Sequence, residues 1–265
     1  MIFENVLLAS DFDGTLKNDD GIITDDVKSA IVNFMKNGGF FTVCTGRIYQ
    51  GFHLYSPDYI NAPVLLGNGA MAYDYENQKV IFNDAIGAEG LPVVNDVLSH
   101  FPDISIEFYN IDCVCAINLN NHSEQHFTSQ GINFKTIEKP DDAPLPWTKV
   151  MIAAHECSQE VQKILDNHPE INYLKTTGDY VEILKKGVDK GTGLLKLAQA
   201  LGCLQKNTYS AGDGYNDVEM LVAAEAGFVP ENGSPEALSV ARYITRSNNE
   251  GCIAHAIEIL EEKYR

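Results

Sequence analysis

The sequence is short of positive charge and of long apolar runs, and each shortage excludes a class of protein. Its 265 residues carry 19 Lys and Arg against 37 Asp and Glu, a formal net charge of -18. Because a surface of that sign repels polyanions, we expect neither nucleic acid nor an anionic membrane surface as a partner. No apolar run approaches the ~20 residues of a membrane span, and the first one contains Glu4 and Asn5 and follows no basic leader. Any phosphate-bearing substrate should therefore be small and should meet positive charge locally.

Cysteine and histidine patterns typical of zinc sites are also missing. The six cysteines form no CxxC pair and no zinc-like cluster, which is typical of free thiols in a reducing cytoplasm. The seven histidines share no ligand-like spacing, so we expect solvent or core roles for them. We therefore expect a cytoplasmic protein, and the sequence indicates no protein partner.

Alternating apolar strands and amphipathic helices dominate both ends of the chain. The runs 5–10 and 40–44 have the composition of buried strands, and the spacing of Val27, Ile31 and Phe34 predicts a helix between them. Short crossovers between continuous apolar strands are typical of a parallel sheet that is covered by helices on both faces. The sequence therefore predicts the α/β class, with a Rossmann-like parallel-sheet core.

The middle third of the chain breaks this rhythm. After Phe82 the pattern changes to a helix, paired strands and a Pro-rich loop at 139–147, which together indicate an α+β unit. The strand and helix alternation resumes near Gly191. We predict a core domain and an inserted second domain, with the ranges 1–83 plus 184–265 and 84–183, respectively.

Carboxylates follow two of the predicted core strands. In ASDFDGT, Asp11 and Asp13 lie two residues apart, so at an extended strand end both side chains reach the same side. AGDGYND repeats the arrangement, with Asp213 just after a strand and Asp217 one helical turn further on. Converging carboxylates repel one another unless a cation holds them, and hard oxygen donors favour Mg²⁺ over zinc. The sequence therefore predicts a magnesium site at the carboxyl edge of the sheet.

Two further residues would complete a phosphate site at this edge. Thr45 ends a predicted strand and opens the turn TGR, where a hydroxyl and backbone amides can cradle a phosphate. Lys190 opens the next core helix, a place where its charge opposes the helix dipole. That unfavourable placement favours a functional role, in which the ammonium offsets the carboxylates and holds a phosphoryl oxygen.

In chain order, DFDGT, TGR, DKG and GDGYND resemble the four motifs of the haloacid dehalogenase (HAD) superfamily. The large insertion between the second and third motifs resembles the type IIB (C2B) cap of the Cof-like sugar-phosphate phosphatases. The resemblance covers nearly the whole chain, because GNGA, YVEILKKGVDKG and SNNEGCIAHAI are also similar to segments of that family.

The resemblance implies a role for each matching residue. Asp11 would be the nucleophile that forms an aspartyl-phosphate, and Asp13 would protonate the leaving oxygen and then activate water. Thr45 and Lys190 would stabilise the transferring group. The metal would be held by Asp11, the backbone carbonyl of Asp13, Asp213 and Asp217. The phosphate would also be contacted by Gly46, Arg47, Asn68 and Asn216.

Three functions remain open from the sequence. The first is a Mg²⁺-dependent phosphatase for a small phosphorylated metabolite, such as a sugar phosphate or flavin mononucleotide. The second is a phosphomutase of similar architecture, and the third is a receiver-like module that binds phosphate without turnover. Receivers lack the second aspartate and a large cap, and a cap is useful where a substrate must be enclosed. The sequence therefore favours an enzyme.

Two segments depart from the family pattern. FVPENGS, residues 228–234, stands where many Cof-like members have a Met-Gly/Ala-Asn-Ala segment. LKNDDG, residues 16–21, is more acidic than a phosphate pocket suggests.

Overall fold

The structure is a computed structural model that describes residues 1–155, 157–175 and 180–265. Its internal contacts divide the chain into two compact units. The first, here called the core unit, comprises Met1–Gly46, Leu54–Phe82 and Asp189–Arg265. The second, here called the inserted unit, comprises Arg47–His53 and Asn83–Val188.

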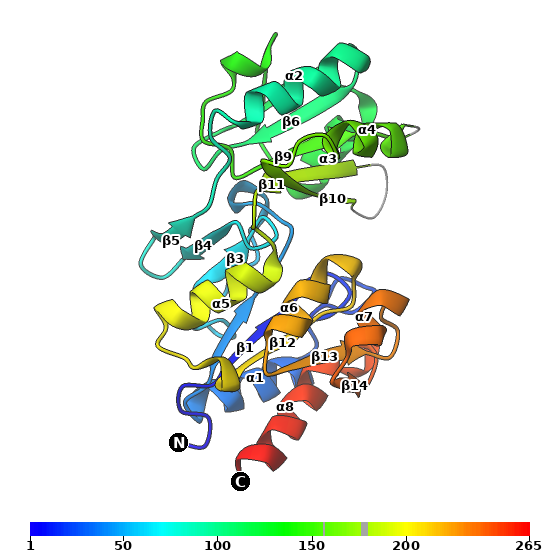
Figure 1. The fold of residues 1–265 in the computed structure, drawn as a ribbon. Helices are drawn as coiled ribbons and strands as arrows, with labels where there is room; N and C mark the ends of the chain where they lie inside the picture. Colours follow the sequence, from blue (N-terminus) through cyan, green and yellow to red (C-terminus); the bar gives the residue numbers. More distant parts are fainter. Residues whose placement is uncertain (156, 176–179) are drawn as a thin grey trace. The chain divides into compact units, whose positions relative to one another are not determined.

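A parallel sheet of five strands forms the centre of the core unit (Figure 1). Its spatial order is β14, β13, β12, β1 and β2, with the bounds Tyr243–Thr245, Ala226–Pro230, Thr208–Ala211, Leu7–Ser10 and Phe40–Val43. All four neighbouring pairs are parallel, so the carboxyl ends of the strands share one edge. β1 lies between β12 and β2, and it is buried along its whole length because both of its faces are covered.

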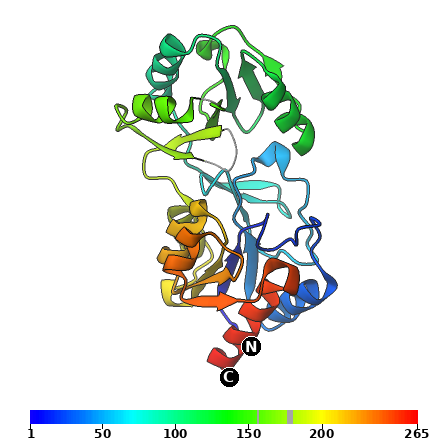
Figure 2. The same cartoon turned by 90° about the vertical axis from the view of Figure 1, so that its right-hand side faces the viewer.

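Two sets of helices cover the faces of this sheet, and Figure 2 shows the sheet between them. The core-unit helices are α1, α5, α6, α7 and α8, with the bounds Asp25–Lys36, Lys190–Ala200, Val218–Ala223, Pro235–Val240 and Cys252–Tyr264. Leu194 and Leu197 of α5 pack with Met220 of α6 against Leu7 and Ala9 of β1. α1 and α8 pack against each other. Single 3-10 turns precede β12, α6 and α8, at Gln205–Asn207, Tyr215–Asp217 and Asn248–Glu250.

A small three-stranded sheet follows β2 in the chain. Its strands β3, β4 and β5 have the bounds Val64–Leu66, Met71–Asp74 and Lys79–Asn83. β3 and β4 are antiparallel and form a hairpin around GNGA, residues 67–70. An isolated parallel bridge joins Cys44 to Leu65, so the hairpin turn lies beside the carboxyl end of β2.

A six-stranded sheet forms the centre of the inserted unit. Its spatial order is β10, β11, β9, β6, β7 and β8, with the bounds Ile171–Lys175, Tyr180–Lys185, Lys149–Ala153, Ser105–Tyr109, Val114–Ile117 and Lys135–Thr136. Its helices are α2, α3 and α4, with the bounds Gly90–His100, Asn121–Gln130 and Ser158–Leu165. Single 3-10 turns lie at Tyr49–Gly51 and Pro140–Asp142.

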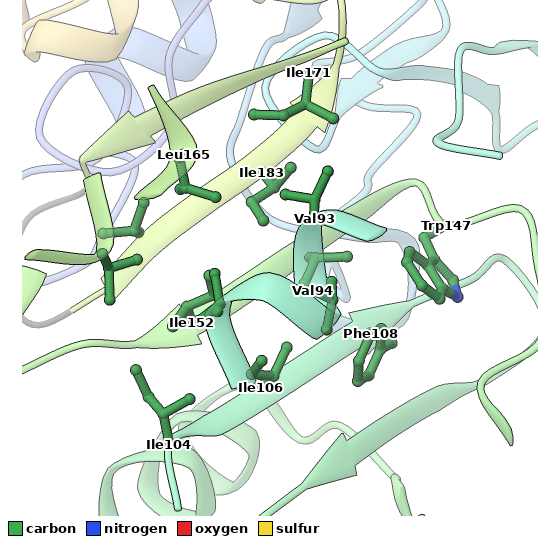
Figure 3. Close-up of a cluster of buried hydrophobic side chains, with 14 of the residues drawn as sticks. Val93, Val94, Ile104, Ile106, Phe108, Trp147, Ile152, Leu165, Ile171 and Ile183 are labelled. Atoms are coloured by element: carbon green, nitrogen blue, oxygen red, sulfur yellow. The ribbon is translucent and has the colours of Figure 1, made fainter. Parts of the chain in front are cut away.

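The apolar core of the inserted unit lies between one face of this sheet and two helices. Val93 and Val94 of α2 meet Ile106 and Phe108 of β6, and Trp147 packs on Phe108 with ring centroids 4.8 Å apart (Figure 3). The other face carries a smaller cluster, in which Phe127 of α3 packs with residues of β6, β7 and β9. The unit therefore has an α+β architecture with its own core.

The structure differs from the predicted elements in a few places. The sequence patterns did not predict α3, because only Ser123 and Phe127 of that helix are buried and its apolar face is too narrow to show a period. Compared with the predicted ranges, the division by contacts adds Arg47–His53, Asn83 and residues 184–188 to the inserted unit. Within the described ranges, no helix has both the length and the apolar character needed to cross a membrane.

Candidate active site

Asp11 and Lys190 meet at the carboxyl edge of the core sheet. Asp11 directly follows β1, and its amide donates to the Ala211 carbonyl at the end of β12, 2.8 Å away. Lys190 is the first residue of α5, and its Nζ lies 2.5 Å from Asp11 Oδ1. The Lys190 side chain is fully buried and that of Asp11 is 11% exposed, so water screens this ion pair little.

Asp217 is the second partner of Lys190. The lysine Nζ lies 2.6 Å from Asp217 Oδ1, while Asp217 Oδ2 accepts from the amides of Asp213 and Gly214, at 3.0 and 2.8 Å. Asp217 therefore ties the start of α5 to the turn that carries Asp213. Its carboxylate is satisfied on both oxygens, which explains how a charged group can be buried there.

Three carboxylates form a compact cluster at this place. Asp11, Asp213 and Asp217 each offer an oxygen atom, and these atoms all lie within 4.8 Å of one another. Three carboxylates against one ammonium leave an excess of negative charge in a mostly buried site. Hard oxygen donors at this separation fit a divalent cation, so the residues present match the predicted metal site in their chemistry.

The pKa shifts of the clustered groups agree with a site for a cation. Burial raises the pKa of the Asp11 carboxyl to about 8; the Lys190 charge opposes the rise, and the Asp217 and Asp213 charges add to it. Burial also raises the pKa of Asp213, against the hydrogen bond from Thr15. For Lys190, burial alone would lower the pKa, but the two carboxylates raise it above its usual value. A cation among the carboxylates would favour their ionised forms.

Thr15 and Gly14 of the DFDGT turn also belong to the cluster, although neither was predicted as a site residue. Thr15 Oγ1 donates to Asp213 Oδ1, 2.5 Å away, and so orients that carboxylate. Gly14 has a φ of +91°, and a Cβ built there would lie 2.8 Å from Asp213 Oδ2. The DFDGT turn therefore fits against Asp213 only because glycine leaves that space open.

A close contact between two glycines fixes the start of α5. A Cβ built on Gly193 would lie 2.6 Å from Gly69 Cα in the hairpin turn. Asp189 caps the helix, because its side chain accepts from the Thr192 amide while Thr192 Oγ1 accepts from the Asp189 amide. Lys190 therefore lies between a capped helix start and the backbone of the hairpin turn, which fixes the position of its backbone.

Asn68 and Asn216 meet across the site edge. Asn216 Nδ2 donates to Asn68 Oδ1 at 3.1 Å, and the buried Asn68 lies in the hairpin turn with a φ of +53°. The Asn68 amide donates to the Thr45 carbonyl at 3.0 Å, and a Cβ on Gly46 would lie 3.2 Å from Asn68 Oδ1. The structure thus brings Thr45, Gly46, Asn68 and Asn216 together within the core unit.

Asp13 and Arg47 are placed differently. The Asp13 side chain is 50% exposed and pairs with Lys17 Nζ at 3.1 Å, outside the three-carboxylate cluster. Arg47 belongs to the inserted unit, so its predicted contact with phosphate stays a prediction. The predicted metal role of Asp13 concerned its backbone carbonyl and also stays a prediction.

The fold and the site together define an α/β protein with a cluster of carboxylates and a buried lysine at the carboxyl edge of its parallel sheet. The sequence profile of the haloacid dehalogenase-like hydrolases matches residues 8–257, and the chain belongs to that family. The predicted resemblance is thereby confirmed, and so is the predicted fold class.

Related proteins cover almost the same length. YxeH of Bacillus subtilis (strain 168), named only as a phosphatase, is 29% identical over 96% of this chain and 97% of its own. YitU of the same organism, named 5-amino-6-(5-phospho-D-ribitylamino)uracil phosphatase, is 27% identical over 95% of this chain and 96% of its own. The predicted enzyme class, a hydrolase of phosphoric monoesters, agrees with the family and with these names.

Solved structures of similar fold extend over both units. A haloacid dehalogenase-like hydrolase from Bacteroides thetaiotaomicron has a TM-score of 0.82 and 23% identity, and the match covers 96% of this chain and 99% of that one. A protein described as the HAD subclass IIB sugar phosphatase BT4131 has a TM-score of 0.86 and 20% identity, with 97% and 99% covered. At these identities the likeness shows the fold, including the inserted α+β domain of the predicted type.

Proposed function

We propose that this protein is a Mg²⁺-dependent phosphatase that hydrolyses a small phosphorylated metabolite through an aspartyl-phosphate on Asp11. The observation that carries the proposal is the buried Lys190 ammonium between Asp11 and Asp217, with Asp213 in the same cluster. Such a site holds a nucleophile, a fixed positive charge and a set of metal ligands within reach of one phosphoryl group.

In the first half of the reaction, an Asp11 oxygen attacks the phosphorus atom and the bond to the leaving oxygen breaks. Asp13 donates a proton to that oxygen, and the alcohol departs. The exposed position of the Asp13 side chain suits this role, because a proton donor must reach the substrate rather than the metal ligands. Asp11 then carries the phosphoryl group.

In the second half, Asp13 takes a proton from a water molecule, and that water attacks the phosphorus atom. The Asp11–phosphorus bond breaks, which releases inorganic phosphate and restores both carboxyl groups. Lys190 stabilises the charge on the phosphoryl oxygens in both halves. Thr45, Gly46, Asn68 and Asn216 supply donors at the same edge.

Asp11, Asp213, Asp217 and the Asp13 carbonyl would hold Mg²⁺. When bound, the ion would neutralise charge on the transferring group and keep the carboxylates from repelling one another. The inserted unit is proposed to act as a cap that excludes bulk water and contacts the leaving group. Its sheet and core are independent of the core unit, as a movable domain requires.

Two names among the similar proteins guide the choice of substrate class. YitU is named for the phosphate ester of a ribityl chain, and BT4131 is described as a sugar phosphatase. Both substrates are phosphate esters of polyhydroxylated carbon chains. We propose the same class here, which includes sugar phosphates and flavin mononucleotide.

The test is phosphate release by the purified protein. Activity on 4-nitrophenyl phosphate should require Mg²⁺ and be lost with EDTA, and Asp11→Asn should abolish turnover while far-UV circular dichroism and the thermal unfolding midpoint match the wild type. A panel of phosphorylated metabolites then ranks substrates. Wild-type rates in Asp11→Asn would show that the nucleophile is misassigned. No turnover of any ester would favour a phosphate-binding module, and conversion of a hexose 1-phosphate to the 6-phosphate without free phosphate would favour a mutase.

A further inference from the structure

We infer that Asn248 is a positioning residue for this reaction. Its hydrogen bonds link the loop 16–21 to the turn 231–234, and through these two segments it holds Asp13 and Asp213 in fixed positions relative to each other. The inference rests on the proposed function, because it assigns Asp13 the proton transfers. It also accounts for three sequence features that the site itself leaves unexplained: the acidic LKNDDG loop, the atypical FVPENGS segment and the SNNEGC segment.

The first arm of this network runs from Asn248 to Asp13. Asn248 Nδ2 donates to the Lys17 carbonyl at 3.2 Å and to Asp19 Oδ1 at 2.9 Å. Lys17 in turn donates from Nζ to Asp13 Oδ1 at 3.1 Å, and its ammonium lies 4.8 Å from the centroid of the Phe12 ring. The acidic loop is therefore held by Asn248 through Asp19 and the Lys17 carbonyl, and Lys17 in turn holds the Asp13 side chain.

The second arm runs from Asn248 to Asp213. Asn248 and Asn232 bond each other twice: Asn232 Nδ2 donates to Asn248 Oδ1 at 3.0 Å, and the Asn248 amide donates to Asn232 Oδ1 at 3.1 Å. Two residues beyond Asn232, the Ser234 amide donates to the Asp213 carbonyl at 2.8 Å. The atypical segment thus contacts the site through backbone and asparagine bonds.

A third contact reaches the site from the start of α8. Cys252 Sγ lies 3.0 Å from the Thr15 carbonyl, and the Thr15 hydroxyl orients Asp213. The segment 248–252 therefore makes hydrogen bonds to the chain that follows Asp11 at three residues, Thr15, Lys17 and Asp19.

The chemistry of Asn248 suits a residue that links two loops. The residue is buried, with 4% of its surface exposed, and its side-chain amide uses its nitrogen as a donor twice and its oxygen as an acceptor once. An aspartate there would lose both donors and face the Asp19 carboxylate. A buried amide with such partners holds its neighbours more firmly than an exposed one, because water does not compete for the bonds.

The neighbouring Asn249 provides a matched control. It is exposed and exchanges two hydrogen bonds with Asp19, at 2.8 and 3.0 Å. Within the described residues, its side chain makes no hydrogen bond to Lys17 or to the turn 231–234. A second control is Asn61, which bonds the Gly39 carbonyl and the Phe41 amide at the opposite end of β2 from Thr45. Loss of either side chain removes asparagine bonds without cutting the link between the two arms.

The experiment compares Asn248→Ala, Asn249→Ala and Asn61→Ala on two esters of similar shape. Phenyl phosphate has a poor leaving group that needs a proton from Asp13, whereas 4-nitrophenyl phosphate has a good one that needs little help. For Asn248→Ala we expect kcat/KM to fall about ten- to a hundredfold on phenyl phosphate, and clearly less on the nitrophenyl ester, because misplacement by about 1 Å costs rates of this order. Asn61→Ala should stay within about threefold of the wild type on both esters. Asn249→Ala loosens Asp19 but keeps the Asn248 bonds to Lys17 and Asp19, so it should lose clearly less than Asn248→Ala on phenyl phosphate.

Hydrogen exchange gives a readout that is independent of turnover. Peptides that cover 16–21 and 231–234 should both exchange faster in Asn248→Ala, whereas Asn249→Ala should affect the first alone and Asn61→Ala neither. Equal losses on the two esters, or an Asn248→Ala variant that behaves like the controls in rate and exchange, would overturn the inference. Those results would leave the proposed function standing if Asp11→Asn is still inactive; an active Asp11→Asn would instead overturn the proposed function itself.

Discussion

The Thr15 hydroxyl donates to Asp213 Oδ1 across 2.5 Å, although 198 residues separate the two in the chain. Thr15 lies in the turn that follows Asp11, and Asp213 follows the neighbouring strand β12. This bond therefore links the loop of the proposed nucleophile directly to a proposed metal ligand. Because it fixes one oxygen of Asp213, it leaves the other in a defined direction.

Thr15→Val should weaken the binding of Mg²⁺ while leaving the fold intact. Valine has the shape of threonine but lacks the hydroxyl, so Asp213 would lose its orienting donor. Loss of such a bond to a metal ligand typically costs about ten- to a hundredfold in affinity. Titration of phosphatase activity with Mg²⁺ should show a higher half-saturation concentration, and isothermal calorimetry should show the same shift without substrate. Thr15→Ser keeps the hydroxyl and should resemble the wild type; equal Mg²⁺ affinity in all three proteins would refute the role given to Thr15.

Residues at strand ends and helix starts could be predicted from the sequence. Asp11 and Asp213 directly follow apolar runs, and Lys190 opens an amphipathic helix, so local pattern alone places them at one edge of a parallel sheet. The structure brings all three together. These predictions needed only the rule that parallel strands share a carboxyl edge.

Contacts between distant loops could not be predicted in this way. Thr15 and Asn248 are small polar residues in turns, where such residues are common, and their importance depends on partners about 200 residues away in the chain. The order of the sheet is set by which strands meet in space, and α3 shows no clear apolar period because it is mostly exposed. Tertiary contact, rather than local propensity, determines these features.

Lys190→Met should destabilise the protein strongly without metal and less so with it. Removal of the ammonium leaves the buried Asp11 and Asp217 facing each other, and an uncompensated charge of this kind costs about 3–5 kcal/mol. A bound Mg²⁺ would offset part of that repulsion. Urea unfolding followed by circular dichroism, with and without Mg²⁺, measures the difference. Lys206→Met, at an exposed position of the core unit, is the control and should unfold like the wild type under both conditions. Destabilisation that is equal with and without Mg²⁺ would argue against a metal among these carboxylates.

Gly193→Ala should lower both stability and kcat. Alanine raises helix propensity by about 0.8–1.0 kcal/mol over glycine, which favours the variant. Its methyl group, however, would lie 2.6 Å from Gly69 Cα, a backbone atom that cannot rotate away, and such overpacking costs about 1–3 kcal/mol. The net effect should therefore be unfavourable, and a shifted α5 would move Lys190 away from Asp11. Thermal unfolding and kcat on 4-nitrophenyl phosphate test this, with Gln199→Ala on the exposed side of α5 as the control. A variant as stable and as fast as the wild type would show that the turn and the helix can separate at no cost.

The inserted unit should lose stability as the pH rises above the ordinary histidine range, because of His168. Its Nε2 lies 2.9 Å from Asp96 Oδ2 on α2, and its Nδ1 lies 2.9 Å from Glu170 Oε1. Partial burial lowers the pKa of His168, but the hydrogen bonds to Asp96 and Glu170 outweigh it, so the pKa lies above the usual 6.5. The same contact lowers the pKa of Glu170.

The sign of this effect follows from the raised pKa in the folded state. The protonated imidazolium is stabilised more in the folded chain than in the unfolded one, so its contribution is complete below pH 6.5 and disappears as the pH rises through the folded value. The Glu170 contribution is lost only in acid, below the ordinary glutamate range near 4.5.

Trp147 is the one tryptophan of the sequence and is fully buried in the inserted unit, so its selectively excited fluorescence reports the unfolding of that unit. The urea midpoint reported by Trp147 fluorescence should fall as the pH rises from 6.5. His168→Gln should flatten this dependence of the midpoint on pH. His53→Gln, which replaces an exposed histidine of the same unit, should leave it unchanged. If the His168→Gln slope equals that of the wild type, the imidazolium does not tie α2 to the end of α4 in the way that the two 2.9 Å contacts indicate.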